Sequence, residues 1–209
     1  GSGAGGATTT GPNNVFVGHL AGNYGTPNTT GSENTMLGSY TYAPATAVQV
    51  NILGHNVVGT QGYTTVGYAS NDIRAAHGGN GVWAAVSDQR YKKDIVDSTA
   101  GLSFINALQP RTWKYKNLGE LPETFNAYKA DSTEVFKNSD TNHGFIAQEV
   151  KAAIDADNGL KDGFRLWAKR DDGAQEIAEA ALIPVLTKAI QELSTQLDAA
   201  LARITTLEG

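Results

Sequence analysis

A nine-residue segment near the middle of the chain gathers side chains suited to catalysis. It reads Ser87-Asp-Gln-Arg-Tyr-Lys-Lys-Asp-Ile95. A serine hydroxyl is a weak nucleophile at neutral pH, and a lysine can take its proton only where burial or a neighbouring cation lowers the pKa of the ammonium group. Arg90 and Lys93 lie close enough in the sequence to supply such a charge. A serine and a lysine five residues apart also occur by chance in many proteins, so this pair alone does not establish a catalytic site.

The spacing of Ser87 and Lys92 limits where their side chains can meet. Residues five apart point to opposite faces of a β-strand and lie well round the cylinder of a helix. The pair therefore needs a turn within one chain, or a lysine from a neighbouring chain. In either case the site depends on folding, because an unfolded chain holds the lysine protonated and misplaced.

Composition changes sharply at this segment. Of the 24 glycines, 17 lie before Ser87, and the charged residues in that part are Glu33, Asp72 and Arg74. We therefore predict a domain boundary near residue 86, with an uncharged, turn-rich domain over 1–86 and an ordinary charged domain over 87–209. The opening Gly-Ser-Gly-Ala-Gly-Gly lacks the features of a signal peptide and is typical of a linker.

A loose repeat of apolar residues followed by glycine runs through residues 13–70. Its copies are Asn14-Val-Phe-Val-Gly18, Asn34-Thr-Met-Leu-Gly38, Asn51-Ile-Leu-Gly54 and Thr64-Thr-Val-Gly67, at intervals of 20, 16 and 13 residues. Each copy predicts a very short strand ended by a glycine that takes up a positive φ. Units this short must stack or associate to close a core. We predict a trimeric Gly-rich β-stalk or β-roll, and a β-sandwich with many turns is the alternative.

After Ser87 the pattern predicts a mixed α+β domain. Its expected elements are a short helix with Leu102, Ile105 and Leu108 on one face that ends at Pro110, a strand over 112–116, a polar excursion over 117–142, a strand and helix over 143–156, and a hairpin between Phe164 and Ile177 with its turn at 170–173.

The last segment predicts a coiled coil over about 183–207. Its apolar residues alternate at intervals of three and four, at Ile183, Leu186, Ile190, Leu193, Leu197, Ala200, Ile204 and Leu207. Isoleucine and leucine are mixed at both position types, which favours three strands over two. Pro184 must then lie in the first turn of the helix, where its missing N–H costs little. A surface helix on a monomer is the alternative.

The segment 87–95 resembles the self-cleaving intramolecular chaperone domain at the C-termini of phage endosialidase tail spikes and long tail fibres. A related domain occurs in a membrane-bound eukaryotic transcription factor. The resemblance continues in order through three further blocks, at 101–116 (Gly-Leu-Ser-Phe-Ile-Asn-Ala-Leu-Gln-Pro, then Trp-Lys-Tyr-Lys), 144–150 (Gly-Phe-Ile-Ala-Gln-Glu-Val) and 182–193 (Leu-Ile-Pro-Val-Leu-Thr-Lys-Ala-Ile-Gln-Glu-Leu). Four ordered blocks make the similarity specific.

The resemblance implies a Ser/Lys dyad in which Ser87 is the nucleophile and Lys92 its base. It also implies cleavage of the Val86–Ser87 peptide bond, by a single-turnover self-cleaving serine endopeptidase with no external substrate. Asp88 and Asp94 are expected to be structural, as capping groups or partners of Arg90 or Lys93. Glu149 sits where the family has an acidic residue, and a carboxylate at a helix start explains it equally well.

Several function classes find no support in the sequence. A net charge of -5 without a basic cluster argues against nucleic acid and anionic membrane as partners, and no apolar run approaches the ~20 residues of a membrane span. Cysteine is absent, so disulfides cannot support the first domain. We expect no cofactor or metal, because the four histidines have no metal-ligand spacing, and zinc is a remote alternative. These histidines are His19, His55, His77 and His143.

The sequence therefore predicts the C-terminal end of a phage tail fibre or spike. In this hypothesis the chaperone domain trimerises the chain, folds the stalk in the host cytoplasm and is released by autoproteolysis, and the stalk joins the virion. The alternative is a host-receptor-binding adhesin tip, acting through residues 1–86 without self-cleavage.

Overall fold

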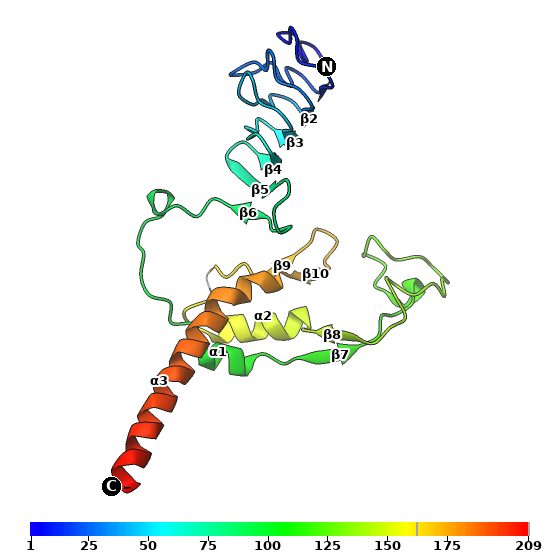
Figure 1. Ribbon diagram of the computed structural model, residues 1–209. Coiled ribbons are helices and arrows are strands. Elements are labelled where there is room, and N and C mark those ends of the chain that lie inside the picture. Colours follow the sequence, from blue (N-terminus) through cyan, green and yellow to red (C-terminus); the bar gives the residue numbers. More distant parts are fainter. Residues whose placement is uncertain (162, 209) are drawn as a thin grey trace. The chain divides into compact units, whose positions relative to one another are not determined.

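The computed structural model describes residues 1–161 and 163–208, in a mixed α/β arrangement with three sheets and a long C-terminal helix (Figure 1). The chain divides into two compact units, Gly1–Asp94 and Ile95–Gly209. The segment that carries Ser87 and Lys92 lies in the first unit.

The N-terminal unit is built on one six-stranded sheet whose strands follow chain order (Figure 1). The strands are β1 (Val15–Val17), β2 (Thr35–Leu37), β3 (Asn51–His55), β4 (Tyr63–Tyr68), β5 (Asn71–Ala76) and β6 (Ala84–Ala85). The first four pair in parallel, with Val17, Leu37, Leu53 and Val66 in register. The predicted strands are thus confirmed, and they form one stacked sheet in place of the two packed sheets of a β-sandwich.

Each repeat turns at both ends of its strand through a residue in the left-handed conformation. Before the four parallel strands these residues are Asn13, Glu33, Gln49 and Gly62, and after them Leu20, Tyr40, Asn56 and Ala69. These left-handed residues, the corners of each repeat, recur at the same intervals as the repeat glycines. Loops of different length therefore join the strands with the same backbone conformation at both strand ends. Glycine is therefore not the only residue that supplies the positive φ.

The inward side of the sheet holds the core of the unit. Phe16, Met36, Ile52 and Thr65 lie in register on this side, and Met36 and Ile52 join a buried cluster with Ala43, Ala47, Val50 and Val57. Two asparagines hold the successive loops together. Asn34 accepts a hydrogen bond from the Val50 N–H at 2.9 Å and donates one to the Ala47 carbonyl at 2.8 Å, and Asn14 accepts from the Asn34 N–H at 3.0 Å.

The prediction that the first six residues form a linker is wrong. The Ser2 carbonyl accepts a hydrogen bond from the Leu20 N–H at 2.9 Å, and the Gly5 N–H donates to the Ala21 carbonyl at 2.9 Å. Gly1 lies against Gly18 as Gly18 lies against Gly38. These residues stack as one more coil, because their small side chains allow the same close approach of backbones.

We expect Gly38→Ala to destabilise the N-terminal unit by at least about 2 kcal/mol, because crowding and backbone strain add. Gly38 has a φ of 125°, and a Cβ there would overlap the carbonyl oxygen of Gly54. Gly62→Ala is the matched control, since Gly62 has a φ of 74° but open space around its Cβ position. Thermal unfolding of the full chain measures both, and equal losses would contradict the stacking argument.

In the second unit, the described residues 95–161 and 163–208 form three α-helices and two antiparallel strand pairs (Figure 1). Its elements are α1 (Leu102–Ala107), β7 (Arg111–Trp113), β8 (Asn142–Gly144), α2 (Ala147–Ala156), β9 (Trp167–Lys169), β10 (Gln175–Ile177) and α3 (Ile183–Glu208), with one-turn helices η2 (Leu118–Glu120) and η3 (Glu179–Leu182). The strands pair antiparallel as β7 with β8 and β9 with β10. The predicted hairpin with its turn at 170–173 is confirmed.

The core of this unit lies where α1, α2 and the start of α3 meet. Its buried residues are Ala100, Phe104, Leu108, Val150, Ile154, Leu166, Leu182 and Val185. Phe104 and Leu108 are buried on α1 and just after it, whereas Leu102 and Ile105 are only partly buried. The excursion between β7 and β8 is held near its base by an isolated bridge between Asn117 and Val135.

The helix α3 begins at Ile183 with Pro184 in its first turn, as predicted. Val185 and Ala189 are its buried residues, and Glu192 accepts a hydrogen bond from the Leu102 N–H at 2.8 Å. The predicted seam lies on another side of the helix. Its eight apolar residues, the first Ile183 and the last Leu207, are all exposed. Much of α3 extends beyond α1 and α2 (Figure 1). The apolar side chains of the predicted seam are therefore uncovered in the single chain.

Candidate active site

A single 3₁₀ turn brings Ser87 and Lys92 together. The turn, η1, spans Gln89–Tyr91, with the Tyr91 N–H donating to the Asp88 carbonyl at 3.1 Å and the Lys92 N–H to the Gln89 carbonyl at 2.9 Å. The Lys92 Nζ then donates a hydrogen bond to the Ser87 Oγ at 2.7 Å. The turn closes a spacing that a strand or a regular helix would keep open.

Asp88 holds this turn in shape. Its Oδ1 accepts the Arg90 N–H at 2.8 Å and the Arg90 Nε at 3.0 Å, and its Oδ2 accepts the Arg90 Nη2 at 2.7 Å. These bonds from the Arg90 side chain and backbone lower the pKa of the Asp88 carboxyl, and the charge of Lys92 lowers it further. The expected pairing of Asp88 with Arg90 is confirmed. The charge of Arg90 is therefore paired with that of Asp88. Lys93, next to Lys92 in the sequence, forms no ion pair among the residues that the structure describes.

The Ser87–Lys92 pair is open to water in the single chain. Ser87 and Lys92 are both exposed, and so are the apolar side chains around them. Val86 is 61% exposed and Tyr91 is 77% exposed, and the exposed apolar set also includes Val82, Trp83, Ile95 and Val96. Burial is one of the ways in which a lysine becomes able to act as a base, so a reactive form of this exposed pair requires that water be removed.

The Val86–Ser87 bond lies one residue beyond the last strand of the sheet. β6 ends at Ala85, which pairs with Ile73 of β5. Val86 is therefore the single residue between a paired strand and the serine. This places the serine hydroxyl, the lysine and the preceding peptide bond within one short, accessible segment.

Glu149, the other acidic residue singled out from the sequence, lies in the second unit and pairs with Arg111. Its two carboxylate oxygens accept Nη2 at 2.8 Å and Nε at 3.0 Å. These hydrogen bonds lower the pKa of the Glu149 carboxyl. Because Arg111 begins β7 and Glu149 lies in the first turn of α2, the pair ties the strand to the helix, which is a structural role.

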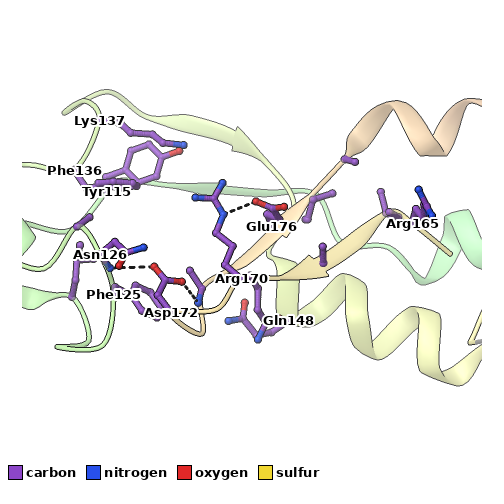
Figure 2. A pocket seen from close by; sticks show the side chains of 18 residues that line it. Tyr115, Phe125, Asn126, Phe136, Lys137, Gln148, Arg165, Arg170, Asp172 and Glu176 are labelled. Atoms are coloured by element: carbon purple, nitrogen blue, oxygen red, sulfur yellow. Dashed lines mark hydrogen bonds and ion pairs between the residues drawn. The ribbon is translucent and has the colours of Figure 1, made fainter. Parts of the chain in front are cut away.

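Two features of the second unit escaped the sequence analysis. One is the contact of Glu192 with the start of α1, which joins residues 90 positions apart and has no local signal. The other is a pocket of about 900 Å³ on the β9–β10 hairpin, shown in Figure 2. There Arg170 pairs with Glu176 at 2.6 Å, and Asp172 accepts the Asn126 N–H at 3.1 Å. Lys137 and Arg165 also line the pocket.

Within the described residues 1–161 and 163–208, no three His, Asp or Glu side chains converge as a metal site would require. His77 instead contacts Asn51 and Thr64 at 3.3 and 3.0 Å. Among the same residues, no helix has the length and apolar character needed to cross a membrane.

Comparison with known proteins gives one match. A family model described as chaperone of endosialidase, in a peptidase family, covers residues 87–159. The match begins at Ser87 and extends through α2. Searches among curated proteins and among solved structures give no match.

Proposed function

We propose that this chain is the C-terminal end of a phage tail fibre or spike, because a family model described as chaperone of endosialidase, in a peptidase family, matches residues 87–159. The family supports a chaperone role in tail-fibre folding. In our proposal, residues 87–209 align three copies and fold the stalk, 1–86. The chaperone domain is then released by cleavage at Val86–Ser87.

The observation that carries this proposal is the 2.7 Å hydrogen bond from Lys92 Nζ to Ser87 Oγ, next to the proposed bond. Neutral Lys92 takes the hydroxyl proton as Ser87 Oγ attacks the Val86 carbonyl carbon. The C–N bond breaks as the Ser87 nitrogen takes up that proton, which leaves an ester between Val86 and the serine oxygen. Water hydrolyses the ester, giving a Val86 carboxylate and restoring the hydroxyl. The reaction occurs once per chain and needs no external substrate or cofactor.

Assembly makes this reaction conditional. The exposed seam of α3 provides the apolar stripe of a three-stranded coiled coil, and the apolar side chains around the dyad provide a second surface for neighbouring copies. When three chains meet, water leaves the dyad and the lysine can lose its proton. Cleavage then follows assembly and removes the chaperone, so the folded stalk is kinetically trapped. The finished stalk becomes part of the virion, whereas folding takes place in the host cytoplasm.

The test is the mass of freshly folded protein over time. We expect the wild-type 22.0 kDa chain to give two fragments, 1–86 and 87–209, whereas Ser87→Ala stays intact. Light scattering should report a trimer for the variant, because the substitution leaves the α3 seam unchanged. A wild-type chain whose mass stays constant on prolonged incubation at neutral pH would exclude self-cleavage.

A row of aromatic side chains favours the second candidate, an adhesin tip that binds a host-surface receptor through residues 1–86. His19, Tyr40, His55 and Tyr68 follow the repeat glycines, with successive ring centroids 5.3, 5.4 and 5.3 Å apart. His19, His55 and Tyr68 are exposed and Tyr40 is partly exposed. Accessible rings with polar tips suit the recognition of glycans or proteins. An adhesin without self-cleavage predicts one intact chain in the experiment above, and this outcome separates the two candidates.

A further inference from the structure

The outward side of the N-terminal sheet carries a continuous apolar row. Val17, Leu37, Leu53 and Val66 lie in register across four parallel strands, and Ile73 of β5 pairs with Val66. Val17 and Leu53 are each 55% exposed, Leu37 is 37% and Ile73 is 43% exposed. The alternation of side chains in a strand places this row on the side opposite Met36 and Ile52. The row is therefore an uncovered strip and takes no part in the core of the chain.

The strand residues on the same side include no Asp, Glu, Lys or Arg. Asp72 and Arg74 are the charged residues of β5, and they alternate with Ile73, so they point to the opposite side. Glu33 lies at the corner before β2, where its carboxylate accepts a hydrogen bond from Gln49 at 2.9 Å. A partner could cover the row without burying an unpaired charge, whose desolvation is costly.

The strands already satisfy one another within the chain. Successive repeats form the backbone hydrogen bonds of the parallel ladder, and the inward side is filled by side chains of the same chain. A partner therefore has no strand to exchange along this stretch and must pack face to face on the row. Its apolar side chains must repeat at the strand spacing of about 4.8 Å to match five successive strands.

We propose that the row Val17, Leu37, Leu53, Val66 and Ile73 is the surface through which three copies of this chain pack side by side in the stalk. This inference rests on the trimer of the proposed function. A second copy carries the same row with the same spacing and no charge, so each residue meets its equivalent around the three-fold axis. Ala85 pairs with Ile73 and continues the row, so the packed surface ends one residue before the Val86–Ser87 bond.

A single-cysteine crosslink tests this surface, because the chain contains no cysteine of its own. We would place Leu53→Cys in the Ser87→Ala chain, which remains full length, and oxidise it under native conditions. A disulfide needs Cβ atoms within about 4.5 Å. We expect a crosslinked dimer band that takes up two of the three chains in each trimer. Thr46→Cys is the matched control, since Thr46 is exposed on the loop between β2 and β3 and outside the row.

The oligomeric state separates the two levels of the proposal. A trimer in light scattering, with Leu53→Cys crosslinking no faster than Thr46→Cys, would overturn the row and leave the trimer intact. The same result is expected if the row instead binds a host receptor. A monomer would overturn the trimer and the row together. A trimer with rapid crosslinking only at Leu53→Cys would support both.

Discussion

In a Lys92→Met chain we expect the two cleavage fragments to be lost almost completely, with the rate of self-cleavage reduced by about 100-fold to 10,000-fold. Methionine is similar to lysine in length and apolar bulk but has no amine. The substitution would therefore remove the hydrogen bond of 2.7 Å between Lys92 Nζ and Ser87 Oγ. Among the described residues, no other basic side chain contacts this hydroxyl. Intact mass spectrometry over a time course measures the fraction cleaved.

The neighbouring lysine provides the control for this substitution. Lys93→Met removes the same charge one residue away, and no hydrogen bond to Ser87 is lost. We expect this chain to be cleaved to completion, with at most a modest change in rate, because Lys93 acts only through its charge. Light scattering should report the same trimer for both variants. If Lys93→Met abolished cleavage as fully as Lys92→Met, the assignment of Lys92 as the base would be wrong.

The glycine intervals of the N-terminal part predicted its strands well. The intervals of 20, 16 and 13 residues between repeat glycines are the spacings of the strands that pair in register. The sequence did not predict the left-handed corners at residues such as Leu20 and Tyr40, because those residue types seldom adopt a positive φ alone. Their conformation is imposed by the stacked neighbours. For the same reason Gly1–Gly6 was misread, since a run of small residues looks like a linker until its stacking partner is known.

The candidate site shows a different limit. Similarity to a family pointed to Ser87 and Lys92 as a catalytic pair. Their spacing alone did not decide whether they meet through a turn within one chain or across two neighbouring chains. The turn is set by the Asp88 carboxylate, which binds the backbone and the side chain of Arg90 together. Such a local contact between a carboxylate and a nearby arginine can be expected from the residue types, and the sequence did predict that Asp88 pairs with Arg90. The exposure of Ser87 and Lys92 could not be predicted in this way, because it depends on the tertiary fold around the turn.

The apolar seam of α3 gives the prediction that tests assembly itself. We expect the double variant Leu193→Lys/Leu197→Lys to stop the chain from forming trimers, since a trimer would bury six ammonium groups along one seam. These side chains are 49% and 60% exposed in the single chain, so the fold of the second unit should survive. Light scattering should report a mass near 22.0 kDa, with the helical circular dichroism largely retained.

The same variant shows whether cleavage depends on assembly. In a monomer the Ser87–Lys92 pair stays hydrated, so we expect the protein to remain uncleaved even though both residues are present. Ser194→Lys/Gln196→Lys is the matched control, because these exposed polar residues flank the same seam positions and lie outside the apolar a and d positions. It should remain trimeric and should be cleaved as the wild type is. Full cleavage in a monomeric double variant would show that the hydroxyl is activated within one chain alone, and assembly would then no longer control the release of the chaperone domain.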